Sequence, residues 1–201
     1  MSTTGPSVHE LHSLATRQDG YFTAEQAAEL GFDSAMVRVN LATNTWTRVE
    51  RNLFRLGQWP HSELEVFAMW CAWFGGEAVI SHQSAAELHG FGHLHPQFVH
   101  VCAFGDLRLT DTRLAVHRLR LEPRDVESAG TFNLTTPVRT VLDLAAGGIS
   151  QITLDEVVCD AVAIGRVDPH TLYTEAGNST DRVAERVWHC PPVRSREIGC
   201  S

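Results

Sequence analysis

Apolar residues recur at helical spacing near the start of the chain and predict its first element. Leu11, Leu14 and Ala15 fall on one face of residues 9–17, so we expect a helix there. The polar and small residues at positions 1–8 are typical of a frayed start. Asp19-Gly20 ends the pattern.

The next apolar pattern predicts two short helices joined by a tight turn. Thr23 and Gln26 have the spacing of a capping box, so a helix should span residues 24–30. Gly31 follows, and glycine takes the left-handed conformation that ends a helix without a steric penalty. Two helices in this arrangement are typical of a helix-turn-helix, whose second helix enters the DNA major groove.

The second helix should begin after Asp33 or Ser34, either of which could cap it. Val37 and Leu41 are four residues apart and therefore share the inward face. The residues left facing outward are Ser34, Ala35, Arg38, Val39, Asn40 and Thr43.

A hairpin is predicted directly after this helix. Apolar residues alternate in 46–49 and again in 53–56, and Asn52 between them tolerates positive φ. A hairpin at this place is a wing, so the first 58 residues should form a winged helix-turn-helix domain.

Beyond Trp59-Pro60 the patterns of helices and strands are interleaved, which predicts an α+β domain over residues 61–176 with a small sheet covered by helices. Strands are expected at 77–80, 98–103, 114–119 and 131–134, and helices at 62–74 with Ser62 as cap, 81–89, 136–146 with Thr136 as cap, 153–164 and 169–176. Residues 177–201 are mixed: 181–188 suit a helix, and from Cys190 onward a disordered tail is expected.

Three motifs occur in order along the chain. The N-terminal part carries FT at 22–23, Gly31, WTR at 46–48 and LFRL at 53–56. The second half carries AVISHQSAA at 78–86 with LHG at 88–90, and TPVRTVLDLA at 136–145. Together these motifs resemble those of the AbiEi-type antitoxins of bacterial type IV toxin-antitoxin systems, and the resemblance spans roughly residues 20–175. It implies a winged N-terminal domain that binds DNA and a second domain with an antitoxin role. Relatives crowd arginines on the second helix, whereas this chain has only Arg38 there.

Composition places the protein among soluble chains of a reducing compartment. Apolar residues make up 43% and charged residues 20% of its 201 positions. The five cysteines form no CxxC pair, the N-terminal residues do not have the pattern of a signal peptide, and the longest apolar run is too short for a bilayer. We therefore expect a cytoplasmic protein.

The formal net charge of −8 disfavours DNA binding overall, but the charge is unevenly distributed. Residues 33–56 hold four arginines against two acids, and residues 61–201 hold eleven arginines against eighteen acids. Because phosphate contacts act locally and distant charge is screened, the winged segment can still bind DNA. We expect modest affinity and a shallow salt dependence.

The residues expected to contact DNA lie on the second helix and the hairpin. Arginine suits guanine and asparagine suits adenine in the major groove, so Arg38 and Asn40 are the candidates for base edges or nearby phosphates. The full set is Ser34, Arg38, Asn40, Thr43, Arg48, Arg51 and Arg55. The alternative is that these side chains are merely solvated.

The sequence predicts neither an enzyme nor a cofactor. The chain has no lysine, which excludes a P-loop, a Schiff base and a nuclease whose site ends in lysine, and Gly-x-Ser-x-Gly is absent.

A metal site is not expected either. His82, His89, His93, His95 and His100 are close in sequence, but Gly90 and Gly92 interrupt a common helical face and no cysteine or acid completes a ligand set at that spacing. Asp143, Asp155, Glu156 and Asp160 are interpreted as exposed helix acids, and Arg139 with Asp143 as an i to i+4 pair.

The resemblance implies an antitoxin that binds inverted or direct repeats in its own promoter as an autorepressor. Two copies on a palindrome would add avidity. The resemblance also implies a nucleotidyltransferase-like partner toxin. The antitoxin would counteract this toxin either by direct contact or indirectly, by opposing its action. One rival is a protein-interaction module whose winged domain no longer binds DNA. The other is a nuclease, because longer relatives carry an endonuclease-like C-terminal domain, for which this chain is expected to be too short.

Overall fold

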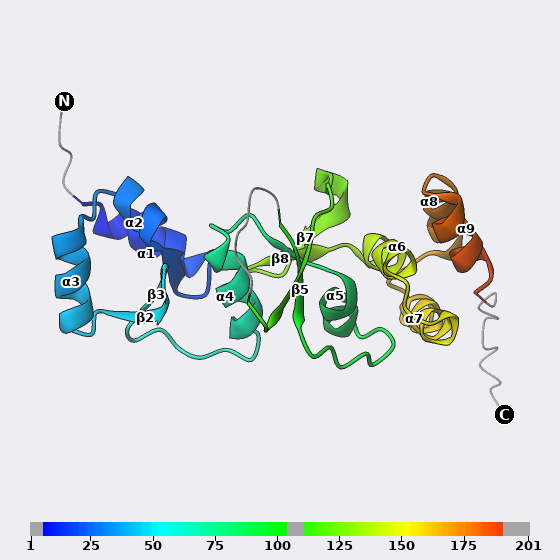
Figure 1. Ribbon diagram of the computed structural model, residues 1–201, viewed down its shortest axis with the longest axis horizontal. Coiled ribbons are helices and arrows are strands. Elements are labelled where there is room, and N and C mark those ends of the chain that lie inside the picture. The colour runs from blue at the N-terminus through cyan, green and yellow to red at the C-terminus, as the bar shows by residue number, and fades with distance from the viewer. Residues whose placement is uncertain (1–5, 104–110, 191–201) are drawn as a thin grey trace.

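The computed structural model describes residues 6–103 and 111–190. In Figure 1 the molecule is elongated, with the first three helices and the strands β2 and β3 at one end, the sheet of the second half in the middle and the last four helices at the other end. The described residues form helices and two small sheets, connected by loops. This confirms the predicted α+β class.

The N-terminal unit has a three-stranded antiparallel sheet flanked by three helices. The strand order is β1-β3-β2, so the first strand pairs with the second arm of the hairpin. The sequence patterns had not predicted β1. Its elements are α1 (Val8–Thr16), β1 (Tyr21–Thr23), α2 (Ala24–Glu29), α3 (Ser34–Ala42), β2 (Trp46–Glu50) and β3 (Leu53–Leu56).

Local capping defines both helices of the predicted helix-turn-helix. The capping box of Thr23 and Gln26 is complete, and Gly31 has a φ of +87° after the helix end. Asp33 caps α3 by accepting hydrogen bonds from two backbone amides, those of Ala35 and Met36, at 2.8 Å each. The segment therefore turns tightly between two capped helices.

Aromatic side chains fill the core of the N-terminal unit. Phe22 and Trp46 meet edge to face with ring centroids 4.8 Å apart, and Phe32 and Phe54 pack against the same indole. Val37 and Leu41 of α3 contact this cluster, as their spacing predicted.

The second half is built on a five-stranded mixed sheet with the order β6-β5-β4-β8-β7. β4 pairs antiparallel with β5 and parallel with β8, while β5 and β6 are parallel. In Figure 1 the sheet lies between α4 and α5. The elements are α4 (Glu65–Trp73), β4 (Val79–Ile80), α5 (His82–His89), β5 (Val99–Cys102), β6 (Leu114–His117), a short 3-10 helix (Pro123–Asp125), β7 (Val126–Ser128) and β8 (Asn133–Thr135).

Strands β5 and β6 separate apolar from polar side chains. Val99 and Val101 pack with residues of α4 in one hydrophobic cluster. Alternation along the strand turns His100 and Cys102 to the opposite face, where Cys102 is paired in register with His117 of β6.

The last four helices share a third hydrophobic cluster, which includes Val183 and Val187. Residues 177–190 are therefore a packed part of the second half rather than an appendage, whereas the boundary expected at residue 176 had set them apart. The tail expected after Cys190 lies outside the described residues. The helices are α6 (Pro137–Gly147), α7 (Gln151–Ala163), α8 (Pro169–Gly177) and α9 (Asp181–Trp188).

The predicted cap at Ser62 is wrong. Helix α4 begins at Glu65, and the Ser62 hydroxyl instead donates to Asp19 at 2.8 Å. Thr136 occupies the N-cap position of α6 as predicted, with Pro137 in the first turn, but its side chain makes no capping hydrogen bond.

The N-terminal unit packs directly on the second half. Tyr21 and Leu53 belong to the same apolar cluster as Ala68 and Cys71 of α4. The Gln26 side chain also donates to the carbonyl of Gly75 at 3.0 Å. The segment at Trp59-Pro60 therefore connects two units that share buried surface.

Within residues 6–103 and 111–190, no helix combines the length and apolarity needed to cross a bilayer.

Candidate functional site

Helix α3 lies at one end of the molecule (Figure 1), and no residue on it is fully buried. Its inward side chains are only half-buried, and Ser34, Arg38 and Thr43 are exposed. Val39 is 61% exposed on the same helix. Among the described residues, Arg38 has no ion-pair partner, so its guanidinium faces solvent. Helix α3 therefore offers the exposed guanidinium of Arg38 and the exposed side chain of Val39 to a ligand.

Two of the α3 candidates already have intramolecular hydrogen bonds. The Asn40 amide donates to the carbonyl of Met36 at 2.9 Å, and the Thr43 hydroxyl lies 3.0 Å from the carbonyl of Val39. A contact with bases would require Asn40 to use its remaining donor or its oxygen. Arg38 is therefore the stronger candidate on this helix.

The hairpin after α3 is short, and its tip is anchored. The loop consists of Arg51 and Asn52, and the Asn52 carbonyl accepts a hydrogen bond from the Ala24 amide at 3.1 Å. The register shifts at Val49, where the strand has a bulge. Asn52 does not have the positive φ that the sequence suggested; Asn44, before the hairpin, does, at 55°.

Arg48 and Arg51 are exposed on the hairpin. The Arg48 guanidinium lies 5.2 Å from the centroid of the Phe54 ring and donates to the carbonyl of Arg51 at 3.2 Å. These contacts orient the guanidinium without neutralising its charge. Both side chains can therefore still contact phosphates.

Arg55 departs from the prediction that it contacts DNA. It is 7% exposed, its guanidinium lies 2.9 Å from the Glu65 carboxylate, and it also donates to the carbonyl of Pro60 at 2.9 Å. The group lies over the Tyr21 ring at 4.9 Å. Alternation places its side chain on the face of β3 that packs against α4, so Arg55 joins the two halves.

The negative charge of Glu50 on the hairpin is compensated from the second half. Arg113, just before β6, contacts Glu50 and Asp111 at 2.7 Å each, and its guanidinium lies over the Trp70 ring at 4.8 Å. The hairpin therefore keeps the charges of Arg48 and Arg51 unopposed by its own acid. Sequence spacing gives no signal for this pair, because its members are 63 residues apart.

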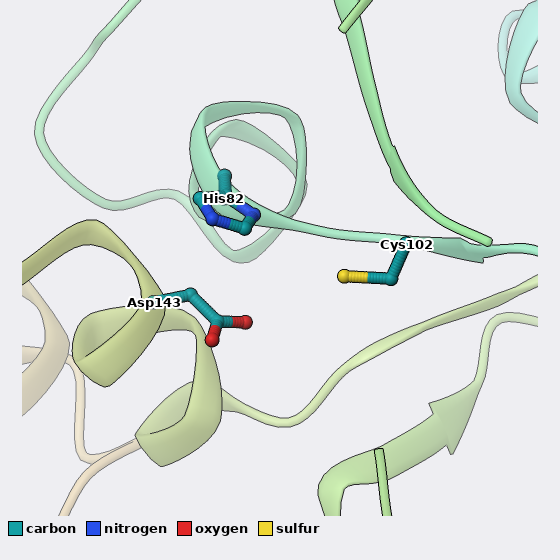
Figure 2. A group of neighbouring side chains, drawn as sticks. All are labelled: His82, Cys102 and Asp143. Atoms are coloured by element: carbon teal, nitrogen blue, oxygen red, sulfur yellow. The ribbon is translucent and has the colours of Figure 1, made fainter. Parts of the chain in front are cut away.

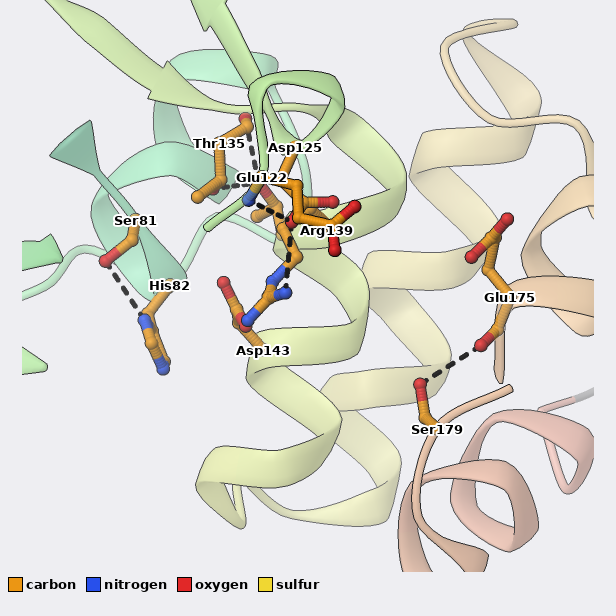
Figure 3. A network of polar contacts seen from close by, with 10 residues as sticks. Ser81, His82, Glu122, Asp125, Thr135, Arg139, Asp143, Glu175 and Ser179 are labelled. Atoms are coloured by element: carbon orange, nitrogen blue, oxygen red, sulfur yellow. Dashed lines mark hydrogen bonds and ion pairs between the residues drawn. The ribbon is translucent and has the colours of Figure 1, made fainter. Parts of the chain in front are cut away.

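The second half has its own polar centre around Arg139 of α6. Figure 3 shows Arg139 reaching both Asp125 and Asp143, at 3.4 Å and 2.8 Å. The predicted i to i+4 pair with Asp143 is confirmed. The expectation that Asp143 is an exposed helix acid is wrong, because it is 2% exposed. Burial raises its pKa to about 6 against the opposing effect of Arg139.

A row of histidines lies next to this centre on the polar face of the sheet. The rings of His82 and His117 stack with centroids 3.5 Å apart, and His117 lies 3.0 Å from His100 through ring nitrogens. Burial, with the neighbouring imidazoles and Arg139, lowers the pKa of His82 to about 3; burial and His117 lower that of His100 to about 4. These rings are neutral at physiological pH.

A groove opens beside Arg139 at the surface. It has a volume of about 460 Å³ and carries Arg120 and Arg124 together with Glu122 and Glu175. The mixed charge favours a polar partner surface over a small apolar ligand.

Comparison with known proteins assigns most of the second half to a protein family. Residues 77–190 match the family described as the AbiEi antitoxin C-terminal domain. The RV2827C protein from Mycobacterium tuberculosis has a similar fold, with a TM-score of 0.54 and 15% sequence identity over 89% of this chain and 73% of that chain. No curated protein matches the sequence. Because the matched segment is more than half of the chain and contains the whole polar centre, the protein belongs to the AbiEi antitoxin family.

Proposed function

We propose that this antitoxin is also a DNA-binding autorepressor, which binds repeats in its own promoter through residues 1–58 and acts in the cytoplasm. The observation that carries the proposal is the exposed α3, whose Arg38 makes no ion pair within residues 6–103 and 111–190, between a tight turn and an arginine-bearing hairpin. The order of helices and strands in this unit is that of a winged helix-turn-helix, in which the second helix of the pair enters the major groove.

The proposed contacts divide between phosphates and bases. Arg48 and Arg51 contact phosphates, which fixes register without reading sequence. Arg38 and Val39 face the groove, where arginine reads guanine and an apolar side chain can contact the thymine methyl group. Ser34, Asn40 and Thr43 are secondary contacts, and Arg55 is excluded because it is buried and paired with the half-buried Glu65.

The second half, residues 61–190, is proposed to counteract a nucleotidyltransferase-like toxin, either directly or by opposing its product. Support comes from the family assignment and from the groove beside Arg139, whose paired charges suit a protein surface. Co-expression of the antitoxin with the toxin encoded beside it tests this part. Growth arrest that full-length antitoxin does not relieve would contradict it.

DNA binding is tested by titrating the protein on its own upstream region in a fluorescence-anisotropy assay. Arg38→Ala should weaken binding by roughly 5- to 150-fold, equivalent to about 1–3 kcal/mol. Arg51→Ala should weaken binding to all DNA sequences alike. It should also reduce the slope of log affinity against log salt concentration by about 1. Arg182→Ala, an exposed arginine on α9 at the far end of the molecule, serves as the control and should bind like the wild type.

A protein-interaction module without DNA binding is the second candidate, favoured by the internal hydrogen bonds of Asn40 and Thr43 and by the net charge of −8. Equal affinity for promoter and scrambled DNA, together with full protection against the toxin, would favour this candidate over the repressor.

A further inference from the structure

Three side chains from distant parts of the chain converge beneath the polar face of the sheet. His82 begins α5, Cys102 ends β5 and Asp143 lies on α6, and each offers one ligand atom within 4.8 Å of the other two. All three are buried. Figure 2 shows the imidazole, the thiol and the carboxylate around a common space.

One atom of this cluster lacks a partner. The Asp143 Oδ1 atom accepts from Arg139 at 2.8 Å, whereas Oδ2 is fully buried and, within the described residues, has no hydrogen-bond partner. An unsatisfied buried polar atom costs about 1–3 kcal/mol, and more when it is charged. A carboxylate oxygen without a protein partner, beside a thiol and an imidazole, is therefore suited to bind a cation.

The backbone supports the same conclusion. His82 has a φ of +48°, a conformation that is uncommon outside glycine and that clusters at functional sites. Its ring is held on two sides, by the Ser81 hydroxyl 3.1 Å from Nδ1 and by the stacked ring of His117. A strained main chain combined with a fixed ring orientation is expected of a ligand position.

We propose that His82, Cys102 and Asp143 bind a zinc ion, with water as the fourth ligand. Nitrogen, sulfur and oxygen donors together suit a borderline-soft dication in tetrahedral geometry, of which zinc is the commonest. Bond lengths of roughly 2.0–2.3 Å place tetrahedral ligand atoms about 3.3–3.8 Å apart. The side chains therefore close slightly around the ion.

The charges of the surrounding side chains are consistent with a bound zinc ion. A dication balances one thiolate and one carboxylate, while Arg139 is balanced by Asp125. Burial lowers the pKa of His82, which leaves its imidazole neutral and able to coordinate. Burial raises the pKa of Cys102 to about 11, and a bound metal ion reverses such a shift by deprotonating the thiol.

The ion would join α5, β5 and α6, and so fix α6 against the sheet. This role is independent of DNA binding. It also explains why the spacing of the histidines in the sequence predicted no site: the ligands are 20 and 41 residues apart and meet only through the sheet and α6.

The test is metal analysis of the full chain purified from zinc-containing medium, followed by replacement of zinc with cobalt. We expect about one equivalent of bound metal, and in the cobalt form the intense near-ultraviolet absorption of a thiolate ligand. Cobalt binding without that absorption, or no retained metal and no zinc-dependent rise in Tm, would overturn the proposal.

Variants locate the site. His82→Asn keeps a residue that tolerates positive φ but removes the imidazole, and Cys102→Ser and Asp143→Asn remove the other ligands; each should lower bound metal to near zero. The matched controls are His93→Asn, also at positive φ (+43°), and Cys71→Ser, another buried thiol. Metal that persists in all three ligand variants would contradict the assignment. The cobalt spectrum of the wild type decides the question even if a variant fails to fold.

Discussion

Arg55 shows how burial, rather than residue type, decides the role of a single side chain. Its position in an arginine-bearing hairpin suggested a phosphate contact, yet the guanidinium is enclosed by Glu65, Pro60 and the Tyr21 ring. Arg48, seven residues earlier, has the same chemistry and faces solvent. The difference follows from the two strands: β2 is an edge strand of the sheet, while β3 is central and packed beneath α4.

Removal of Arg55 should therefore affect stability. Arg55→Ala leaves the Glu65 carboxylate without its cation and opens a gap beside Tyr21, so we expect a loss of about 3 kcal/mol in the free energy of unfolding. Urea denaturation followed by tryptophan fluorescence measures it. Arg48→Ala should change stability by less than about 0.5 kcal/mol; similar losses for both variants would contradict the distinction drawn between them.

At the scale of the element, most helix and strand positions follow from sequence-local chemistry. The capping box at Thr23, the left-handed Gly31 and the alternation in β5 each act within a few residues of themselves. The strands β1 and β7 were not predicted, because three-residue strands carry too little periodicity and exist only through pairing with β3 and β8.

The capping box permits a direct test at this scale. Thr23→Ala removes the acceptor for the Gln26 amide at 3.1 Å and should destabilise the protein by about 1 kcal/mol, the typical value of an N-cap. Thermal denaturation monitored by circular dichroism gives the change. Ser34→Ala, at an exposed first position of α3 that does not cap it, is the comparison and should be near neutral; an equal loss there would argue against a specific cap.

For the whole molecule, the two halves behave as one packed body. The Arg55–Glu65 and Arg113–Glu50 pairs and the shared cluster around Tyr21 connect the N-terminal sheet to α4 and β6. A ligand on the hairpin and a partner on the second half would thus act on a common core, which gives the proposed repressor and antitoxin roles a physical connection.

The buried histidines predict how stability depends on pH. The pKa values of His82, His100 and His117 are all lowered by burial, so the unfolded chain binds protons that the folded chain does not, and stability falls as pH drops from about 6.5 toward 4. Asp143, with its pKa raised to about 6, acts in the opposite direction. Arg139 and Asp125 are the charged groups that lie beside it.

His82 and His100 oppose the single carboxyl group of Asp143, so the net slope near pH 5 should be at least about 1.4 kcal/mol per pH unit, corresponding to about one proton. The lowered pKa of His117 adds to this slope. Urea denaturation of chelator-treated protein at a series of pH values measures it. His82→Asn should reduce the slope by about one proton. A stability that does not change between pH 7 and pH 5 would contradict the neutral histidine row.

By itself, the sequence determined the α+β class, the positions of most helices, the Arg139–Asp143 pair and the family, because each depends on contacts or motifs that are local along the chain. Only the tertiary structure decided that Arg55 is internal, that Asp143 is buried, that α9 belongs to the core and that His82, Cys102 and Asp143 meet. The physical reason is the same in all four cases. Burial and long-range proximity are set by how the sheet and helices pack, and residues tens of positions apart leave no periodic signal of their meeting.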